Sequence, residues 1–333
     1  LAGSGGEREE VRRTLPGSSG YGGRCKDHCE GGAEVPREAL ALADEIRRRH
    51  DGSVSAILFY GSCLRRAYVE GGVLDFYAVV DSYRSAYRSS LLAASNSLLP
   101  PNVYYVDMPF EGGALRMKYN VISQADFSAA CRPECLHPII WARFCQPAAV
   151  VYARDEETRS LLAGDAAEAA VTIISRMLAL HPDAATTEQL WQAGFGTTYT
   201  TEMRVESPET IRSVYEAAPE RYAQVVALAV EVLARRGLVQ GRVDGHLLQV
   251  RMAEPARQAI VRSWNRKLPI AKGIYVVRLI KSAFTFGDWL PYALWKLNRH
   301  SGVTIELTER QRRHPLIFGW PVILRLIRGK TLR

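Results

Sequence analysis

The fold is decided by two apolar stretches, AILFYGS at residues 56–62 and LDFYAVV at residues 74–80. Both are rich in the β-branched and aromatic residues that favour buried strands. The first stretch ends in Gly61-Ser62, and the second carries a carboxylate, Asp75, near its start. We therefore predict strands over 56–60 and 74–80 in a small mixed sheet with flanking helices, rather than in a doubly wound parallel sheet.

The surrounding sequence predicts an α+β protein in four parts. Residues 1–35 are predicted to be a disordered tail, 36–155 a mixed-sheet domain, 156–261 a mostly helical domain and 262–333 a basic C-terminal region. The elements expected are a helix at 36–49, a hairpin of strands at 103–106 and 115–123, helices at 165–179, from Ser207-Pro208 and at 220–236, and a second hairpin at 238–250. A hairpin after helices makes a winged-helix-like module possible.

The net charge of +8 is unevenly distributed along the chain. Residues 262–333 contain 15 Lys and Arg against 3 Asp and Glu, whereas the remaining residues carry a net charge of −4. This asymmetry predicts an anionic partner: a nucleotide, an acidic lipid surface or nucleic acid. No nucleic-acid recognition module is visible, so nucleic acid is not expected. A basic surface without a dedicated partner is the alternative.

The basic C-terminal region also carries aromatic residues, among them Trp264, Trp289 and Trp320. Such helices can lie in a membrane interface or pack on the body of the protein, and the sequence leaves both open. No apolar run reaches the ~18 residues that span a bilayer, and the N-terminus has no signal-peptide core. We therefore expect a cytoplasmic protein, peripheral on the inner face of a membrane.

Six cysteines do not form the pattern of a secreted disulfide framework. They form two groups, and either could be read as a metal site, although small buried or loop cysteines are the favoured interpretation. The first group is Cys25 and Cys29 around His28, and the second is Cys131, Cys135 and Cys145 with His137.

The two strands and the turn between them have the layout of a nucleotidyltransferase core. Gly61 lets a backbone approach phosphates closely, and Ser62 offers a hydroxyl and a backbone N–H at an expected helix N-terminus. Asp75 is the best candidate ligand for a divalent metal, for which Mg²⁺ is expected. Lys118, on the strand predicted at 115–123, could neutralise phosphate charge, and Arg65, in the loop after Ser62, is a further candidate for nucleotide binding.

A second acid normally follows two residues after the first in this layout, and here that place is taken by Tyr77. Three arrangements fit: Asp107 or another acid completes the metal site, one metal suffices, or catalysis has been lost. An ordinary turn with a strand-capping aspartate is the structural alternative.

Further motifs resemble those of the mitochondrial-type CDP-diacylglycerol synthases, the soluble phosphatidate cytidylyltransferases. Their order is kept over about residues 55–296, and the departures are Asn120 for a glycine, Gln146 for a lysine and Arg116 for an acid. The matching segments are Phe59-Tyr60-Gly61-Ser62, Leu74-Asp75-Phe76-Tyr77, Lys118 to Ser123, Trp141 with Arg143 and Pro147, Glu202 to Arg204, Glu206-Ser207-Pro208, Lys272-Gly273 and Lys281-Ser282.

The resemblance implies a bacterial relative that makes CDP-diacylglycerol and pyrophosphate from CTP and phosphatidate with Mg²⁺. Gly61 and Ser62 would hold the triphosphate, Asp75 would bind metal, and Lys118 and Arg143 would meet phosphates. The basic C-terminal region would bring the protein to an anionic membrane. Two alternatives remain: transfer to another small-molecule or protein acceptor, and a catalytically silent module that binds lipid.

Overall fold

The structure is a computed structural model that describes residues 35–65, 72–111, 113–202 and 206–285. The tail predicted over residues 1–35, except its last residue, and the aromatic segment beyond residue 285 lie outside the described residues. The first described helix, α2 (Arg37–Arg49), confirms the helix predicted there. Its apolar side, Ala39, Leu42, Ala43 and Ile46, is buried.

A five-stranded mixed sheet forms the centre of the N-terminal half, in the order β3-β4-β2-β1-β5. Strands β1 (Val54–Tyr60) and β2 (Val73–Val80) confirm the two predicted central strands and pair antiparallel. The pairing of β2 with β4 (Gly113–Ser123) is parallel, and every other pairing in the sheet is antiparallel. The predicted α+β class with a mixed sheet is therefore confirmed.

The edges of the sheet depart from the prediction. Strand β3 (Asn102–Phe110) forms the predicted hairpin with β4 but is longer, because it pairs along nearly the whole of its partner. The opposite edge strand, β5 (Ala148–Ala153), was not predicted, although it lies within the predicted mixed-sheet domain. Its small and β-branched residues have no diagnostic period, and pairing with β1 determines their conformation.

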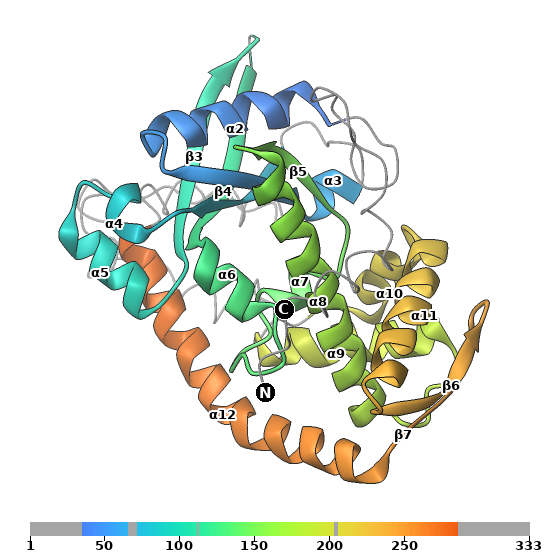
Figure 1. The fold of residues 1–333 in the computed structure, drawn as a ribbon. Helices are drawn as coiled ribbons and strands as arrows, with labels where there is room; N and C mark the ends of the chain where they lie inside the picture. Colours follow the sequence, from blue (N-terminus) through green and yellow to red (C-terminus); the bar gives the residue numbers. More distant parts are fainter. Residues whose placement is uncertain (1–34, 66–71, 112, 203–205, 286–333) are drawn as a thin grey trace, which may run out of the picture.

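The two faces of the sheet are covered by different elements (Figure 1). One face packs on α2 through Ile57, Phe59, Phe76 and Met117. Helices α6 (Gln124–Ala130), α7 (Trp141–Phe144) and α8 (Glu156–Leu180) contribute to the core on the other face. Short helices α4 (Tyr83–Ala86) and α5 (Ser90–Leu98) connect β2 to β3.

Helices and a small hairpin make up the second half. Helix α8 is followed by α9 (Thr187–Thr201), α10 (Pro208–Glu216) and α11 (Pro219–Arg235). Strands β6 (Val239–Asp244) and β7 (Leu247–Met252) form the predicted second hairpin, with β6 against α11. Their core is continuous with that of the sheet, since Tyr77 and Trp191 belong to one buried cluster.

The last described helix, α12 (Glu254–Thr285), is a single element that crosses the predicted boundary between residues 261 and 262. It contacts α8, α9 and β3, and Lys281 donates a hydrogen bond to the carbonyl of Leu99. Several of its apolar side chains are nevertheless exposed, including Val277, Leu279 and Ile280.

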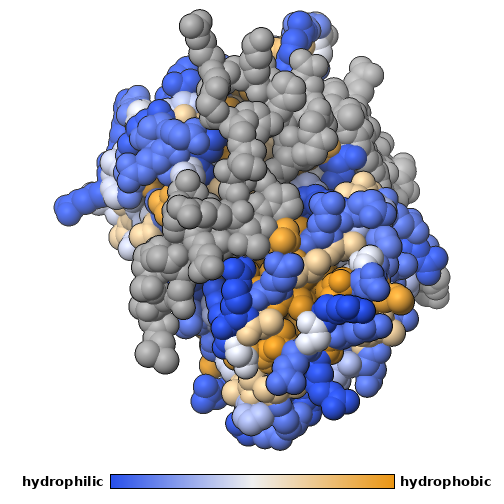
Figure 2. Space-filling view, turned by 45° about the vertical axis from the view of Figure 1, so that its right-hand side comes forward, coloured by the Kyte–Doolittle hydropathy of each residue, from blue (hydrophilic) through white to orange (hydrophobic). Residues whose placement is uncertain are grey.

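The surface in Figure 2 is largely hydrophilic where it is coloured, with hydrophobic residues showing between the polar ones in its lower half. Within the described part of the chain, no helix has both the length and the apolar character required to cross a membrane.

Candidate functional site

The turn after β1 brings the backbone of Gly61 against the side chain of Asp75. Tyr60 and Asp75 are register partners in the β1–β2 pair, so the turn begins beside the carboxylate. Gly61 has a φ of 91°, and a Cβ atom placed there would lie 3.0 Å from Asp75 Oδ2. Glycine is therefore required both by the left-handed backbone and by the close approach.

Ser62 follows directly and begins α3 (Ser62–Arg65), a helix of four residues. Its side chain is exposed beside the turn. A helix this short aligns few peptide dipoles, so the helix contribution to phosphate binding expected from the sequence is small. What the turn offers an anion is the exposed hydroxyl and the open backbone of Gly61.

Lys118 reaches Asp75 from the neighbouring parallel strand. The two residues are register partners in the β2–β4 pair, and Lys118 Nζ lies 2.7 Å from Asp75 Oδ1. Their side chains are 31% and 23% exposed, so the ion pair is accessible but partly withdrawn from water. The structure thus brings together three of the predicted site residues: Gly61, Asp75 and Lys118.

Arg143, on α7, is held by a buried carboxylate. Its guanidinium forms two hydrogen bonds with Glu202, at 2.7 and 3.0 Å, and a third with the carbonyl of Ile139 at 2.7 Å. Burial disfavours the charged guanidinium, but the negative charge of Glu202 acts in the opposite direction and the pKa of Arg143 lies well above its ordinary value. Arg143 is therefore a fixed positive charge.

The charges of Arg143, Asp75 and Lys118 all act on the buried hydroxyl of Tyr60. Burial, and then the negative charge of Asp75, raise the pKa of the Tyr60 hydroxyl, whereas the positive charges of Lys118 and Arg143 lower it. Asn120 donates a hydrogen bond to this hydroxyl at 3.3 Å and another to the carbonyl of Phe76 at 3.1 Å. One negative side chain, Asp75, and two positive ones, Lys118 and Arg143, thus influence a buried phenol hydroxyl.

Arg65 ties the turn to the segment after α7. Its Nη1 atom donates to Gln146 Oε1 at 3.3 Å, and Gln146 Nε2 donates to the carbonyl of Ala142 at 2.9 Å. Gln146 stands where the resemblance leads one to expect a lysine. In this chain the position anchors an arginine instead of supplying a charge of its own.

Asp107 is not brought to Asp75. It lies on the edge strand β3, two strands away from β2, and Arg116 Nε binds its carboxylate at 3.0 Å. Tyr77, at the place of the second acid, is 1% exposed and packs against Tyr60 and Phe144 with ring centroids 5.5 and 5.2 Å away. The expectation that Asp107 completes a two-carboxylate metal site is therefore not supported by this arrangement.

Among the described residues, no three His, Cys, Asp or Glu side chains are grouped to hold a metal ion. Cys131 and Cys145 are buried, and Cys135 Sγ donates to the carbonyl of His137 at 3.2 Å. Burial is the main reason that the pKa of each of the three thiols is raised. The other predicted group, Cys25 with Cys29, lies outside the described part of the chain.

Two participants in the site, Asn120 and Glu202, occur in the sequence motifs but were not predicted as site residues. Asn120 was noted only as a departure from a motif, although its position on the same face of β4 as Lys118 could have indicated its place. Glu202 is 59 residues from Arg143 along the chain, and no local pattern links them.

Comparisons with known proteins add little. No protein-family model matches the chain, and no match was found among curated proteins. Among solved structures, it is similar to a nucleotidyltransferase-like protein from Exiguobacterium sibiricum 255-15, with 9% identity, a TM-score of 0.25, and coverage of 88% of this chain and 92% of that one. A likeness at this level supports no inference, and the α+β class rests on the elements described above.

Proposed function

We propose that the chain is a nucleotidyltransferase that works at the turn between β1 and β2. The observation that carries the proposal is the placement of the Asp75 carboxylate, against the backbone of Gly61 on one side and 2.7 Å from Lys118 Nζ on the other. Phosphoryl chemistry relies mostly on positioning and charge stabilisation, and this site offers both a close backbone and paired charges.

In the proposed reaction, an acceptor oxygen attacks the α-phosphorus of a nucleoside triphosphate. The new phosphorus–oxygen bond forms as the bond to the bridging oxygen breaks, and pyrophosphate leaves with the electron pair. Lys118 would exchange part of its contact with Asp75 for a phosphate oxygen, and Arg65 would supply charge at the exposed turn. Arg143 would stabilise the phosphates through its positive charge rather than by direct hydrogen bonds, because its guanidinium donors are bound to Glu202.

The residues fit one Mg²⁺ ion that arrives with the nucleotide. Mg²⁺ is commonly bound by one or two carboxylates together with substrate phosphates and water, and Asp75 can supply one carboxylate. They do not fit two ions held by the protein, since Arg116 occupies Asp107 and Tyr77 is buried. When bound, the ion would neutralise triphosphate charge.

The finer assignment is CTP as nucleotide and phosphatidate as acceptor, at the inner face of a membrane. The sequence resemblance supports the substrates. Two observations support the lipid: α12 exposes apolar side chains, and the sequence of residues 262–333 contains 15 Lys and Arg. Val277 is 54% exposed, Leu279 58% and Ile280 59%, an apolar surface of the kind that enters a lipid headgroup layer.

The test is pyrophosphate release from CTP with Mg²⁺, with and without phosphatidate liposomes, with ATP, GTP and UTP as controls. We expect release that requires phosphatidate and prefers CTP. Release of pyrophosphate with another acceptor and without liposomes would support the nucleotidyltransferase proposal but reject phosphatidate as the acceptor. Liposomes of phosphatidylcholine alone control for surface effects.

A second candidate is a catalytically silent module, and the ion pair itself favours it. Lys118 neutralises Asp75 at 2.7 Å, and the described residues offer no cluster of acids for a metal. This candidate predicts binding to anionic liposomes without release of pyrophosphate from any nucleotide.

A further inference from the structure

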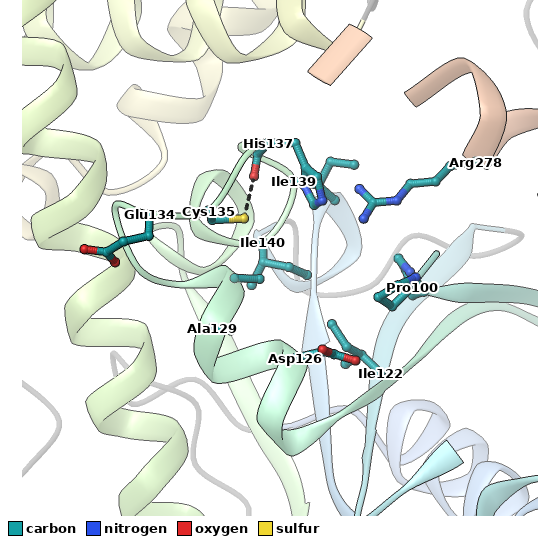
Figure 3. A pocket seen from close by; sticks show the side chains of 12 residues that line it. Pro100, Ile122, Asp126, Ala129, Glu134, Cys135, His137, Ile139, Ile140 and Arg278 are labelled. Carbon is teal, nitrogen blue, oxygen red and sulfur yellow. Dashed lines mark hydrogen bonds between the residues drawn. The ribbon is translucent and has the colours of Figure 1, made fainter. Parts of the chain in front are cut away.

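A cavity of about 310 Å³ is lined by none of the residues Gly61, Asp75 and Lys118. It borders the site, because Ile139, which lines the cavity, accepts the hydrogen bond from Arg143. It is formed by the end of β4, α6, the segment before α7, the loop before β3 and α12 (Figure 3). Its walls are mostly apolar, with Pro100, Ile122, Ala130, Ile139 and Ile140 among them. Small-molecule sites range from about 300 to 1,000 Å³, so the cavity has room for a small ligand.

Arg278 extends from α12 into this apolar space. In Figure 3 its side chain points from the helix towards Ile139 and Pro100. Its Nε and Nη1 atoms are buried and have no hydrogen-bond partner in the part of the chain that the structure describes. Burial is the main reason that the pKa of Arg278 is lowered, to about 10. Buried donor atoms without a partner on a charged group are unfavourable unless a ligand binds them.

A second polar group also lacks a hydrogen-bond partner. His137 lines the same cavity, and its Nδ1 atom is buried without a partner among the described residues. The loop that carries it is fixed by the hydrogen bond from Cys135 Sγ to the His137 carbonyl at 3.2 Å. Two polar side chains, Arg278 and His137, therefore line an apolar cavity and have nitrogen atoms without a hydrogen-bond partner.

The two acidic residues that line the cavity do not neutralise the charge of Arg278. Asp126 accepts hydrogen bonds from Tyr83 at 2.6 Å and from Ser123 at 3.0 Å. Glu134 is exposed, and in Figure 3 its carboxylate points away from Arg278. Neither acid forms an ion pair with Arg278 in the described structure.

We propose that this cavity binds an amphipathic anion, with a carboxylate or phosphate monoester head on Arg278 and a short apolar body against the isoleucine and proline walls. A guanidinium can bind either head through two parallel hydrogen bonds. Bringing the anion to the buried arginine satisfies its donors and its charge together. The apolar walls provide the remaining affinity and select against inorganic anions.

The experiment measures binding of four probes to the full chain by titration calorimetry. Hexanoate and hexyl phosphate carry the two candidate heads, hexan-1-ol carries the body alone and inorganic phosphate the head alone. We expect one of the first two to bind and the last two to bind at least tenfold more weakly. Which of the first two binds more tightly identifies the head.

Arg278→Gln should weaken binding of the preferred probe by about ten- to a hundredfold, the scale for hydrogen bonds to a charged group. Arg266→Gln is the matched control, because Arg266 is exposed on the same helix and does not line the cavity. It should bind like the wild type. Arg278→Lys keeps the positive charge but loses the paired guanidinium donors. Its affinity for the preferred probe should lie between those of the wild type and Arg278→Gln, and it provides a second measurement if Arg278→Gln does not fold.

Equal affinity of the wild type and Arg278→Gln would overturn the proposal, as would hexan-1-ol binding as tightly as the preferred anionic probe. Absence of binding by both anionic probes to the folded wild type would also overturn it. Asp75→Asn should leave probe binding unchanged, so a failure of the nucleotidyltransferase proposal is observed separately from a failure of this one.

Discussion

Lys118 and Asp75 are direct neighbours on the parallel strands β4 and β2, and an ion pair of 2.7 Å joins them. Both side chains are less than one third exposed. The lysine therefore stabilises the carboxylate before any ligand is present and remains positioned beside the place where phosphates would lie. The pair can serve as a resting state for catalysis or as a permanent neutralisation of the acid, and replacement of Asp75 distinguishes the two.

Asp75→Asn should reduce pyrophosphate release by about a hundredfold or more, the scale for loss of one electrostatic contact to the transition state. The amide is similar in size but supplies no negative charge for Mg²⁺. Asp107→Asn is the matched control, because that carboxylate is bound by Arg116 on the edge hairpin, and it should retain wild-type turnover. Equal turnover of the two variants would place the chemistry elsewhere.

Gly61→Ala should destabilise the protein by about 1–2 kcal/mol, since a φ of 91° is unfavourable for a residue with a Cβ atom. It should also lower activity, because the new atom would lie 3.0 Å from Asp75 Oδ2. Gly164→Ala is the control: it lies inside α8, where an added Cβ atom would meet nothing within 4 Å, and it should raise stability by up to about 1 kcal/mol. Urea unfolding measures the stability of both variants. An unchanged free energy of unfolding in Gly61→Ala would contradict the close approach of residue 61 to Asp75 Oδ2.

Glu202→Gln should cost about 3–5 kcal/mol, the range for leaving one member of a buried ion pair uncompensated. The side chains of Arg143 and Glu202 are 23% and 4% exposed, so water cannot fully replace the lost carboxylate. Asp81→Asn breaks an ion pair of the same length with Arg154, but the Asp81 side chain is 49% exposed and that of Arg154 40%. Its effect on the free energy of unfolding should stay within about 1 kcal/mol. Similar losses in the two variants would show that Glu202 is not effectively buried.

His137 should make the folded state sensitive to acid. Burial first, and then the charges of Arg278 and Arg143, lower its pKa from 6.5 to about 3. Between these values the unfolded chain takes up a proton that the folded chain does not, so stability falls as the pH falls below about 6.5, by at most about 1.4 kcal/mol per pH unit.

His137→Gln removes this contribution. The difference in unfolding free energy between pH 7.5 and pH 5 should therefore be smaller in the variant than in the wild type. It should not vanish, because burial also lowers the pKa of His50 and His181. An unchanged difference would mean that His137 is protonated in the folded protein at pH 5.

The sequence predicted the central strands and the hairpin because their signals are local. An apolar run, a Gly-Ser turn and a strand-borne acid placed Gly61 in the turn after one central strand and Asp75 near the start of the other. Alternation along β4 directed Lys118 to the site. Strand β5 was missed because its pairing with β1, about 90 residues earlier, determines its conformation. Glu202 was missed for the same reason, since only the packing of α9 brings it to Arg143.

Asp107 shows a different limit. It was predicted at the end of a strand over 103–106, whereas β3 continues to Phe110 and Asp107 lies inside it. The order of the strands could not be read from the sequence. Because β4 lies between β3 and β2, Asp107 meets Arg116 rather than Asp75. A candidate ligand on the same face of a sheet is therefore close to a site only when the strand order places it there.

Tyr77→Asp tests whether this chain could accept the second acid that the nucleotidyltransferase layout usually contains. We expect at least about 3 kcal/mol of destabilisation, because the change removes a large buried ring and introduces a charge among Tyr60 and Phe144. Tyr77→Phe keeps the ring contacts and should change stability by about 1 kcal/mol or less. If Tyr77→Asp instead folded normally and bound Mg²⁺ more tightly by calorimetry, the position would be a vacant ligand site rather than part of the core, and the single-ion arrangement proposed here would have to be replaced by a two-acid one.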